Sequence, residues 1–225
     1  MTDAPYLTRE GRQTVLVLAS GDEHVPIKYK ARGMFAKIYF RADGVPEVFA
    51  IVEHDTDYSK EIIARIWEED GGSKYLPEII REGALPDSSL VYRMPVYKTP
   101  LRKTDNPTAW RDFAKLKQCA EIANRRHHPG SNRPRFHEGH EVNNMIIECA
   151  SDDPRFNREL LATLENLRDE AANYGSSYQF EFAPRNMATD RDGHLILLDV
   201  LFDLEAAQRK RVESSARRAK AIRPW

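Results

Sequence analysis

Three polar side chains near the end of the chain have the types and spacing that phosphoryl transfer requires. Glu181 stands five residues before Asn186, and Asp199 follows Asn186 by thirteen residues. An amide oxygen and a carboxylate are hard ligands that suit Mg²⁺. A second carboxylate can orient or deprotonate an attacking hydroxyl group. As a set, these residues indicate a magnesium-dependent transfer of a phosphoryl group.

The segment around these residues predicts the elements that position them. It runs YQFEFAPRNMATDRDGHLILLDV: an apolar strand, a turn at Pro184, a hairpin, and a second apolar strand that ends at Asp199. A carboxylate at the end of a strand is held in place by the backbone pairing beside it. Taken one by one, Glu181, Asn186 and Asp199 are more typical of the turns and surface of an ordinary hairpin, so only their combination indicates chemistry.

The first hundred residues predict a small antiparallel sheet and one helix. Strand-like apolar runs occupy residues 14–18, 25–40 (with a turn near Arg32) and 48–52. A helix should follow from Ser59, its expected N-cap, to a stop at Gly71-Gly72. We expect a loop or short helix at 74–82 and strands interrupted by proline at 89–97.

The second half of the chain predicts mainly helices, which makes the fold class α+β. A helical pattern begins at Pro107, and a polar stretch at 127–143 should be a surface loop or an insertion. Asp152-Asp153-Pro154 is typical of a helix start, and a basic helix should begin near Leu204. The helix expected after Pro154 carries its leucines on one face: Leu160, Leu161, Leu164 and Leu167.

Composition limits the class of protein. The 225 residues include 34 basic and 35 acidic side chains, so the net charge of −1 gives the whole molecule no bias toward nucleic acid or membranes. No apolar run approaches the roughly 18 residues of a membrane span. Two cysteines, Cys119 and Cys149, are too few for a disulfide framework, and the polar N-terminus does not resemble a signal peptide. These features favour a reducing, cytoplasmic compartment.

The order of these elements resembles the protein-kinase fold. A hairpin with glycine and aromatic residues, a strand, a helix, a connector, a long helix, an acid-x-x-Pro-x-Asn motif, a second hairpin and an aspartate follow one another. Glu181 and Asn186 match the His-Arg-Asp-x-x-x-x-Asn loop of kinases, with Pro184 two residues before the asparagine, and Asp199 matches the aspartate of Asp-Phe-Gly. The pair Phe180-Glu181 is similar to the Phe-Asp pair of the compact early serine/threonine protein kinases of Autographiviridae podoviruses. The resemblance covers roughly residues 30–204.

This resemblance implies a compact two-lobed fold with a reduced C-lobe. The N-lobe would comprise residues 1–93, the C-lobe 94–204 and a basic tail 205–225. The resemblance also implies ATP and Mg²⁺ as cofactors and host proteins as substrates in the host cytoplasm. Its site residues would be Glu181 as the base, Asn186 and Asp199 as Mg²⁺ ligands, Gly33 and Phe35 over the phosphates, and Met94 beside the adenine.

Three departures from the kinase pattern leave the activity open. Glutamate replaces the catalytic aspartate, only one glycine marks the first hairpin, and the strand at 48–52 lacks the lysine that binds the α- and β-phosphates. Lys37, Lys30 or Lys28 could replace that lysine, although Lys37 should point away from the face that carries Ala36 and Ile38. Glu61 on the early helix could be the acid that pairs with such a lysine, or a plain surface acid.

The sequence therefore allows more than one function. The chain could be an active kinase, a pseudokinase that binds a host or phage protein, or a phosphotransferase for small molecules. The basic segment 208–225 could attach to an acidic partner or to nucleic acid, or could be a solvated helix. The histidines of 127–140 could bind zinc, but they lack the usual ligand spacing and favour a polar loop.

Overall fold

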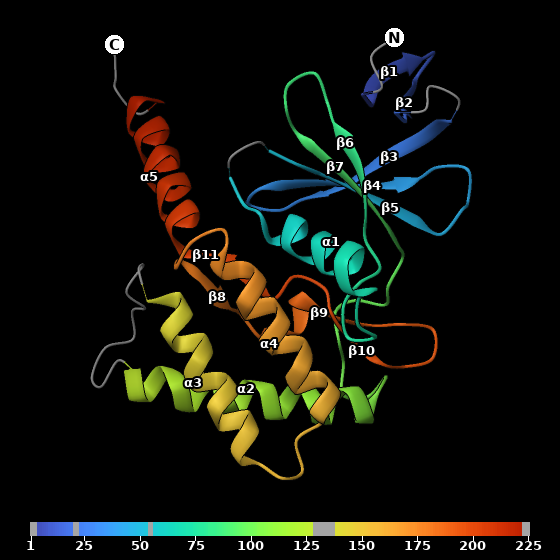
Figure 1. Cartoon of the computed structure of the whole chain (residues 1–225). Helices are drawn as coiled ribbons and strands as arrows, with labels where there is room; N and C mark the ends of the chain where they lie inside the picture. Colours follow the sequence, from blue (N-terminus) through green and yellow to red (C-terminus); the bar gives the residue numbers. More distant parts are fainter. Residues whose placement is uncertain (1–3, 20–22, 54–55, 128–137, 222–225) are drawn as a thin grey trace.

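The computed structural model describes residues 4–19, 23–53, 56–127 and 138–221, the last five of these by their backbone alone (Figure 1). A curled antiparallel sheet and one helix form the first part of the chain, and a group of helices with two short hairpins forms the second. The fold is thus a mixed one of the α+β class. No helix among the described residues is both long and apolar enough to cross a lipid bilayer.

The first part contains a seven-stranded sheet in the order β1-β2-β3-β4-β5-β7-β6. The strands predicted near 14–18, 25–40, 48–52 and 89–97 are confirmed. Two further strands were not predicted: β1 in the polar N-terminal segment, and β6, part of which lies where a loop or short helix was expected. The seven strands are β1 (Tyr6–Glu10), β2 (Gln13–Val17), β3 (His24–Arg32), β4 (Ala36–Arg41), β5 (Glu47–Val52), β6 (Ile80–Ala84) and β7 (Leu90–Pro95).

The two faces of the sheet bury different sets of side chains. On one face, Ala50 and Val52 of β5 belong to the main core together with the isoleucines of α1 (Ser59–Asp70). On the other face, Phe49 and Ile51 belong to a second, smaller core. This alternation follows from the period of two in a strand. The sheet curls so that its two ends approach each other: a Cβ added to Gly83 of β6 would lie 2.9 Å from Cδ of Pro5, next to β1.

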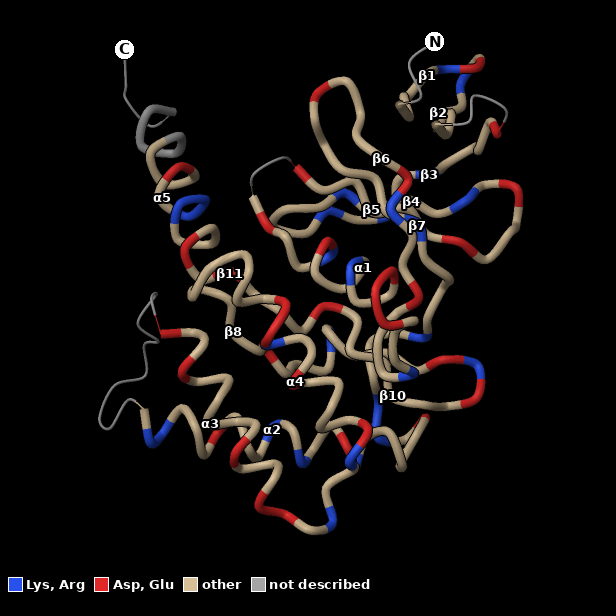
Figure 2. The backbone as a smooth tube through the Cα atoms, in the orientation of Figure 1, with Lys and Arg blue, Asp and Glu red and all other residues tan. Residues whose placement is uncertain are grey.

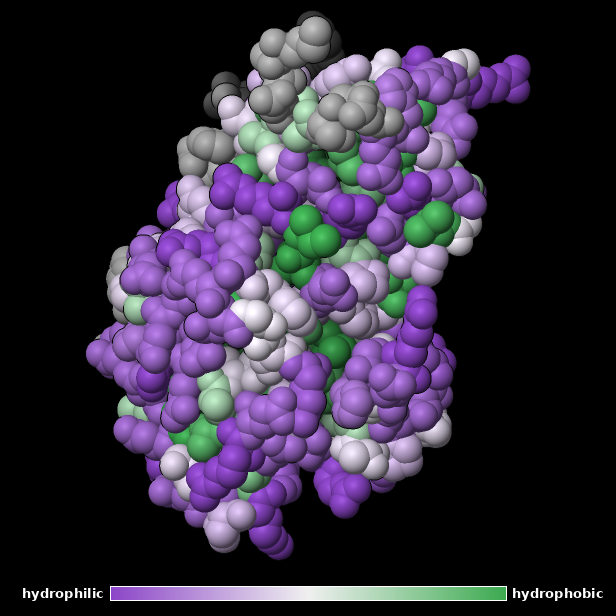
Figure 3. All heavy atoms as spheres, turned by 45° about the vertical axis from the view of Figure 1, so that its right-hand side comes forward, coloured by the Kyte–Doolittle hydropathy of each residue, from purple (hydrophilic) through white to green (hydrophobic). Residues whose placement is uncertain are grey.

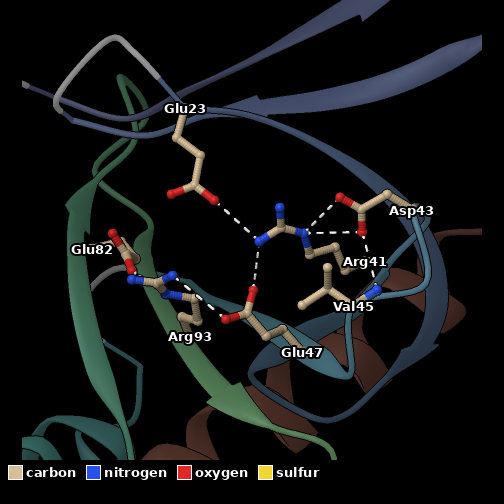
Figure 4. Close-up of polar contacts among 7 residues, drawn as sticks. All are labelled: Glu23, Arg41, Asp43, Val45, Glu47, Glu82 and Arg93. Atoms are coloured by element: carbon tan, nitrogen blue, oxygen red, sulfur yellow. Dashed lines mark hydrogen bonds and ion pairs between the residues drawn. The ribbon is translucent and has the colours of Figure 1, made fainter.

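A charged network crosses the sheet at one end (Figure 4). Glu47 of this network shares a face of β5 with Phe49, two residues further on. Arg41 lies at its centre: Nη1 is 2.7 Å from Oε2 of Glu47 and 3.1 Å from Oε1 of Glu23, and Nε is 2.9 Å from Oδ2 of Asp43. The carboxylates of Glu47 and Asp43 raise the pKa of Arg41. Nε of Arg93 is 2.6 Å from Oε1 of Glu82. The network ties β4, β5, β6 and β7 together.

Three helices form most of the second part: α2 (Pro107–His127), α3 (Gly139–Asp152) and α4 (Arg158–Ala172). The leucine face predicted for α4 is confirmed, since Leu160, Leu161, Leu164 and Leu167 are all buried. The predicted helix start at Asp152 is wrong, because α3 ends there. Asp153 is extended with ψ of 108°, as the residue before a proline tends to be. Helix α4 begins after Asn157, whose side chain accepts hydrogen bonds from the backbone N–H groups of Glu159 and Leu160.

Two short pairs of strands follow α4. Strand β8 (Tyr178–Phe180) pairs with β11 (Leu201–Asp203), and β9 (Met187–Thr189) pairs with β10 (Leu195–Leu197). A short 3-10 helix, Pro184–Asn186, lies between β8 and β9. The last described element is the predicted basic helix, α5 (Leu204–Ala221), which extends away from the rest of the molecule in Figure 1.

Candidate functional site

The pairing of β8 with β11 brings the first half of the predicted motif beside the second. The backbone N–H of Glu181 donates to the carbonyl of Val200 at 2.7 Å. The carbonyl of Asn186 accepts from the N–H groups of Leu198 and Asp199 at 3.0 and 3.1 Å. Backbone hydrogen bonds therefore connect the segments that carry Glu181, Asn186 and Asp199, which are at most eighteen residues apart in the sequence.

The side chain of Asn186 binds that of Glu181. Nδ2 of Asn186 donates to Oε2 of Glu181 at 3.1 Å, and the other carboxylate oxygen of Glu181 forms an ion pair with Arg185. Asn186 is buried, whereas the side chain of Glu181 is 39% exposed and that of Asp199 54%. Two acids thus face solvent around a buried amide.

A lysine that the sequence interpretation missed completes this arrangement. Lys60 of α1 extends to Asp199, with Nζ 2.6 Å from Oδ1 and 3.4 Å from the carbonyl oxygen of Leu198. Its side chain is only 11% exposed. The sequence does contain one signal that Lys60 lies on the buried face of α1: it stands three residues before Ile63, and residues at this spacing share one face of a helix. The structure therefore supplies a cation at Asp199 from a helix and not from a strand.

A second carboxylate lies close to this ion pair. Burial, and to a smaller extent the negative charge of Asp199, raise the pKa of Asp57 to about 6. Asp57 accepts hydrogen bonds from both N–H and Oγ of Ser59, each at 3.0 Å. The prediction of Ser59 as N-cap is wrong: Tyr58 holds that position without a side-chain bond, and Asp57 satisfies the N–H of Ser59. The carboxylates of Asp57 and Asp199 lie near a single lysine, Lys60, so the local charge favours the binding of a further cation.

The two residues expected over the phosphates, Gly33 and Phe35, lie between β3 and β4. Phe35 is 6% exposed and packs against Ala206 and Ala207 of α5. Lys210 of α5 lies over its ring at 5.3 Å from the centroid. Gly33 is exposed at the hairpin tip, where an added Cβ would approach only the Ala36 carbonyl, at 3.7 Å.

Met94, expected beside the adenine, is 6% exposed and belongs to the main core with Val48 and Leu197. Residues of β5, β7 and the β9–β10 hairpin thus share one core.

Figure 3 shows a mainly hydrophilic face on which hydrophobic side chains form separate small areas, one of them near the middle of the view.

None of the three lysines proposed as substitutes has a contact with Asp199 among those of the described residues. Lys37 is exposed, and its neighbours Ala36 and Ile38 pack against the main core, so Lys37 lies on the opposite face of β4, as alternation predicts. Lys30 lies over the ring of Phe40 at 5.4 Å, and Lys28 is exposed.

Glu61 binds neighbours within the sheet instead of a lysine. Its Oε2 accepts from the hydroxyl of Tyr92 at 2.6 Å, and its Oε1 is 2.8 Å from Nη1 of Arg81. Burial and the charge of Glu61 raise the pKa of Tyr92. Glu61 is 12% exposed, so it links α1 to β6 and β7 and is more than a surface acid.

The histidine segment is described only in part. His128 and His137 lie outside the described residues. His127 ends α2, with Nε2 3.0 Å from Oε2 of Glu141. The expected loop through residue 143 is wrong at its end, because α3 already begins at Gly139.

A different group of possible metal ligands lies at the turn between β9 and β10. The ligand atoms of Asp190, Asp192 and His194 are all within 4.8 Å of one another. Nδ1 of His194 is 2.9 Å from Oδ2 of Asp190, and the backbone N–H of His194 binds Oδ1 of the same residue. These bonds explain the group as a turn held together by its own side chains.

The donor set at Asn186 and Asp199 fits Mg²⁺. The amide nitrogen of Asn186 is engaged by Glu181, which leaves the amide oxygen as the donor atom of this side chain. Oδ1 of Asp199 contacts Lys60, and the exposure of the carboxylate leaves Oδ2 open to solvent and to ligands. Mg²⁺ commonly takes one or two protein oxygens and completes its shell with water and phosphate.

No protein-family model matches this chain, and neither the curated proteins nor the solved structures contain a match.

Proposed function

We propose that this protein transfers a phosphoryl group from ATP to a serine or threonine hydroxyl, as a compact protein kinase does. The observation that carries the proposal is the contact of buried Lys60 with Asp199, beside the bonded pair Asn186 and Glu181. Phosphoryl transfer depends on cations and oxygen donors fixed around the phosphates. One helix, one turn and one strand end provide these groups here.

Each residue has a defined task in this proposal. The oxygens of Asn186 and Asp199 would hold Mg²⁺, which offsets the negative charge of the phosphates when it is bound. Lys60 would take the place of the missing strand lysine and contact a phosphate oxygen. Glu181 would orient the substrate hydroxyl and accept its proton while the new O–P bond forms and the bond from the γ-phosphorus to the β–γ bridging oxygen breaks.

The arrangement of elements supports the same proposal at the level of the fold. The β3–β4 hairpin, β5, α1, the connector after β7, the long α2, the Glu181–Asn186 segment, the β9–β10 hairpin and Asp199 follow in the order expected of a kinase. We therefore propose a two-lobed kinase-like fold with a reduced C-lobe. Host proteins as substrates, a phage origin and a site of action in the host cytoplasm belong to the same proposal and rest on the resemblance alone.

A pseudokinase that binds a host or phage protein is the second candidate. Two observations favour it: Arg185 pairs with the carboxylate that should accept the proton, and α5 covers the Phe35 ring. A protein that only binds would keep the fold and the metal ligands without transferring phosphate. The candidates differ in one measurable property, the transfer of label.

The test uses ATP labelled at the γ-phosphate, with Mg²⁺, and the full chain alone or with bacterial lysate. We expect label on protein for the wild type and its loss in Asp199→Ala. Asp169→Ala, which removes an exposed carboxylate on α4, is the matched control and should transfer normally. Absence of label in the wild type, together with no shift in thermal unfolding upon addition of ATP and Mg²⁺, would overturn the kinase proposal. Label that persists in Asp199→Ala would overturn the assigned site.

A further inference from the structure

The β3–β4 hairpin projects beyond the strand that flanks it. β3 has nine residues, but β2 pairs with it only as far as Ile27. The five residues that follow, Lys28 to Arg32, are all exposed. This part of the sheet therefore presents side chains to solvent with no covering element on the β2 side among the described residues.

The projecting hairpin is strongly basic in a chain of net charge −1. Residues 28–41 contain five lysines and arginines and not one acidic residue. Lys28, Lys30 and Lys37 are exposed. Blue segments mark this hairpin in Figure 2, and others lie along the neighbouring α5. Positive charge is thus concentrated on the β3–β4 hairpin and also occurs on α5.

Aromatic and basic side chains alternate on one face of this hairpin. Tyr29 pairs across the strands with Tyr39, and Arg32 pairs with Lys37. The two tyrosine rings are edge to face with centroids 5.7 Å apart, and Tyr29 is 55% exposed. Tyr39 packs against the second core, so this face is the one opposite to α1. An exposed ring that is held by an edge-to-face contact with its cross-strand neighbour is available for stacking.

Helix α5 continues the basic surface. Lys210 pairs with Glu53 and lies over Phe35, and Arg32 is 3.1 Å from the same glutamate. A pocket of about 240 Å³ lies between the hairpin and the helix, and its charged lining residues are Arg32, Arg209, Lys210, Glu53 and Glu213. Arg209 is 59% exposed. A chain of phosphates could follow the cations from the hairpin to the helix.

We propose that the projecting β3–β4 hairpin, with Tyr29, Arg32 and Lys37 on one face and Lys28 and Lys30 on the other, binds single-stranded nucleic acid together with Arg209 of α5. Cations spaced along a strand suit a phosphate backbone, and an exposed tyrosine provides a stacking platform for a base. A double helix is less suited, because its bases are already stacked and cannot reach Tyr29. An acidic protein would use the cations but gain nothing from the aromatic ring. This binding is separate from phosphoryl transfer and does not depend on it.

The test is fluorescence anisotropy with a labelled oligothymidine of about 20 nucleotides, which exceeds the usual length of a single binding site. We expect binding that weakens as KCl rises from about 50 to about 200 mM, since displaced counterions drive it. The triple variant Lys28→Ala, Lys30→Ala, Lys37→Ala should bind at least about 10-fold more weakly and with a shallower salt dependence. Tyr29→Ala should lose about 10-fold and Tyr29→Phe should bind as wild type, because the ring is retained.

The matched control removes the same charge from the helical part: Lys103→Ala, Arg111→Ala and Lys117→Ala, all exposed positions. Its affinity should equal that of the wild type. No anisotropy change at low salt, or equal losses in both triple variants, would overturn the proposal. Unaltered binding in Tyr29→Ala with full competition by polyglutamate would overturn it in favour of an acidic partner. Asp199→Ala should bind the oligonucleotide normally, so failure of the kinase proposal leaves this result unaffected.

Discussion

Nζ of Lys60 lies 2.6 Å from Oδ1 of Asp199, although 139 residues separate them in the chain. The contact joins the first helix of the sheet part to the end of the β10 segment. It fixes a cation at the carboxylate that the sequence predicts as a magnesium ligand.

Lys60→Met should weaken the binding of ATP with Mg²⁺ by about 10- to 100-fold, the range expected when one charged hydrogen bond to a phosphate is lost. Isothermal titration calorimetry measures the affinity directly. Lys74→Met removes another lysine of an ion pair, with Glu159, and should leave the affinity unchanged. Equal affinities of Lys60→Met and wild type would show that Lys60 serves only to hold Asp199.

Asp57 should make the stability of the fold depend on pH. Its folded pKa of about 6 exceeds the ordinary value of about 3.9, so ionisation at neutral pH is opposed in the folded state and not in the unfolded state. The contribution of Asp57 to the free energy of unfolding is therefore largest below about pH 4, and this contribution is lost as the pH rises through about 6. In Asp57→Asn this loss, at most about 3 kcal/mol, should be absent.

Urea unfolding of Asp57→Asn and wild type between about pH 4 and about pH 7 tests this directly. The difference in unfolding free energy should grow with pH in favour of the variant. Parallel pH profiles of the two proteins would contradict the assignment.

Local sequence patterns predicted the helices and strands of this fold better than they predicted the contacts between them. Alternating or apolar runs such as Glu47–Val52 identify strands because the sheet buries them on both faces. The sequence did not predict strand β6, because Arg81 and Glu82 are charged. Both residues form ion pairs in the folded protein, Arg81 with α1 and Glu82 with β7. The spacing of Asn186 and Asp199 drew attention to these two residues. The helical spacing of Lys60 and Ile63 indicates only that Lys60 lies on the buried face of α1, and it does not indicate a partner on a distant element.

The Arg41 network should contribute to stability as a unit. Arg41 is 16% exposed and has three carboxylate partners. Arg41→Met would leave Glu23, Asp43 and Glu47 close together without their cation, so we expect a loss of about 2 kcal/mol in unfolding free energy. Arg12→Met at an exposed turn should change it by less than about 0.5 kcal/mol. Chemical denaturation compares the two, and equal values would show that the network is neutral.

Phe35 should anchor α5 to the hairpin. Its ring is buried against Ala206 and Ala207 and lies under Lys210. In Phe35→Ala the backbone amides of α5 should exchange hydrogen faster, because the helix loses its small apolar contact. Met34→Ala removes a neighbouring side chain that is 38% exposed and should leave this exchange unchanged. Slow exchange of α5 in both variants would show that the helix is held by other contacts.

Gly139 should be required by close packing, and Gly33 should not. Helix α3 begins directly against β8: a Cβ on Gly139 would lie 2.7 Å from the carbonyl oxygen of Tyr178 and 2.8 Å from its carbon. Backbone atoms cannot rotate away as a side chain can, so Gly139→Ala should push α3 off β8 and cost about 2 kcal/mol. The same substitution at Gly33 meets no atom nearer than 3.7 Å and should leave the melting temperature unaltered. If Gly33→Ala keeps its stability but loses affinity for ATP, the small size of Gly33 serves the approach of a phosphate and not the fold, whereas equal destabilisation of both variants would contradict this separation.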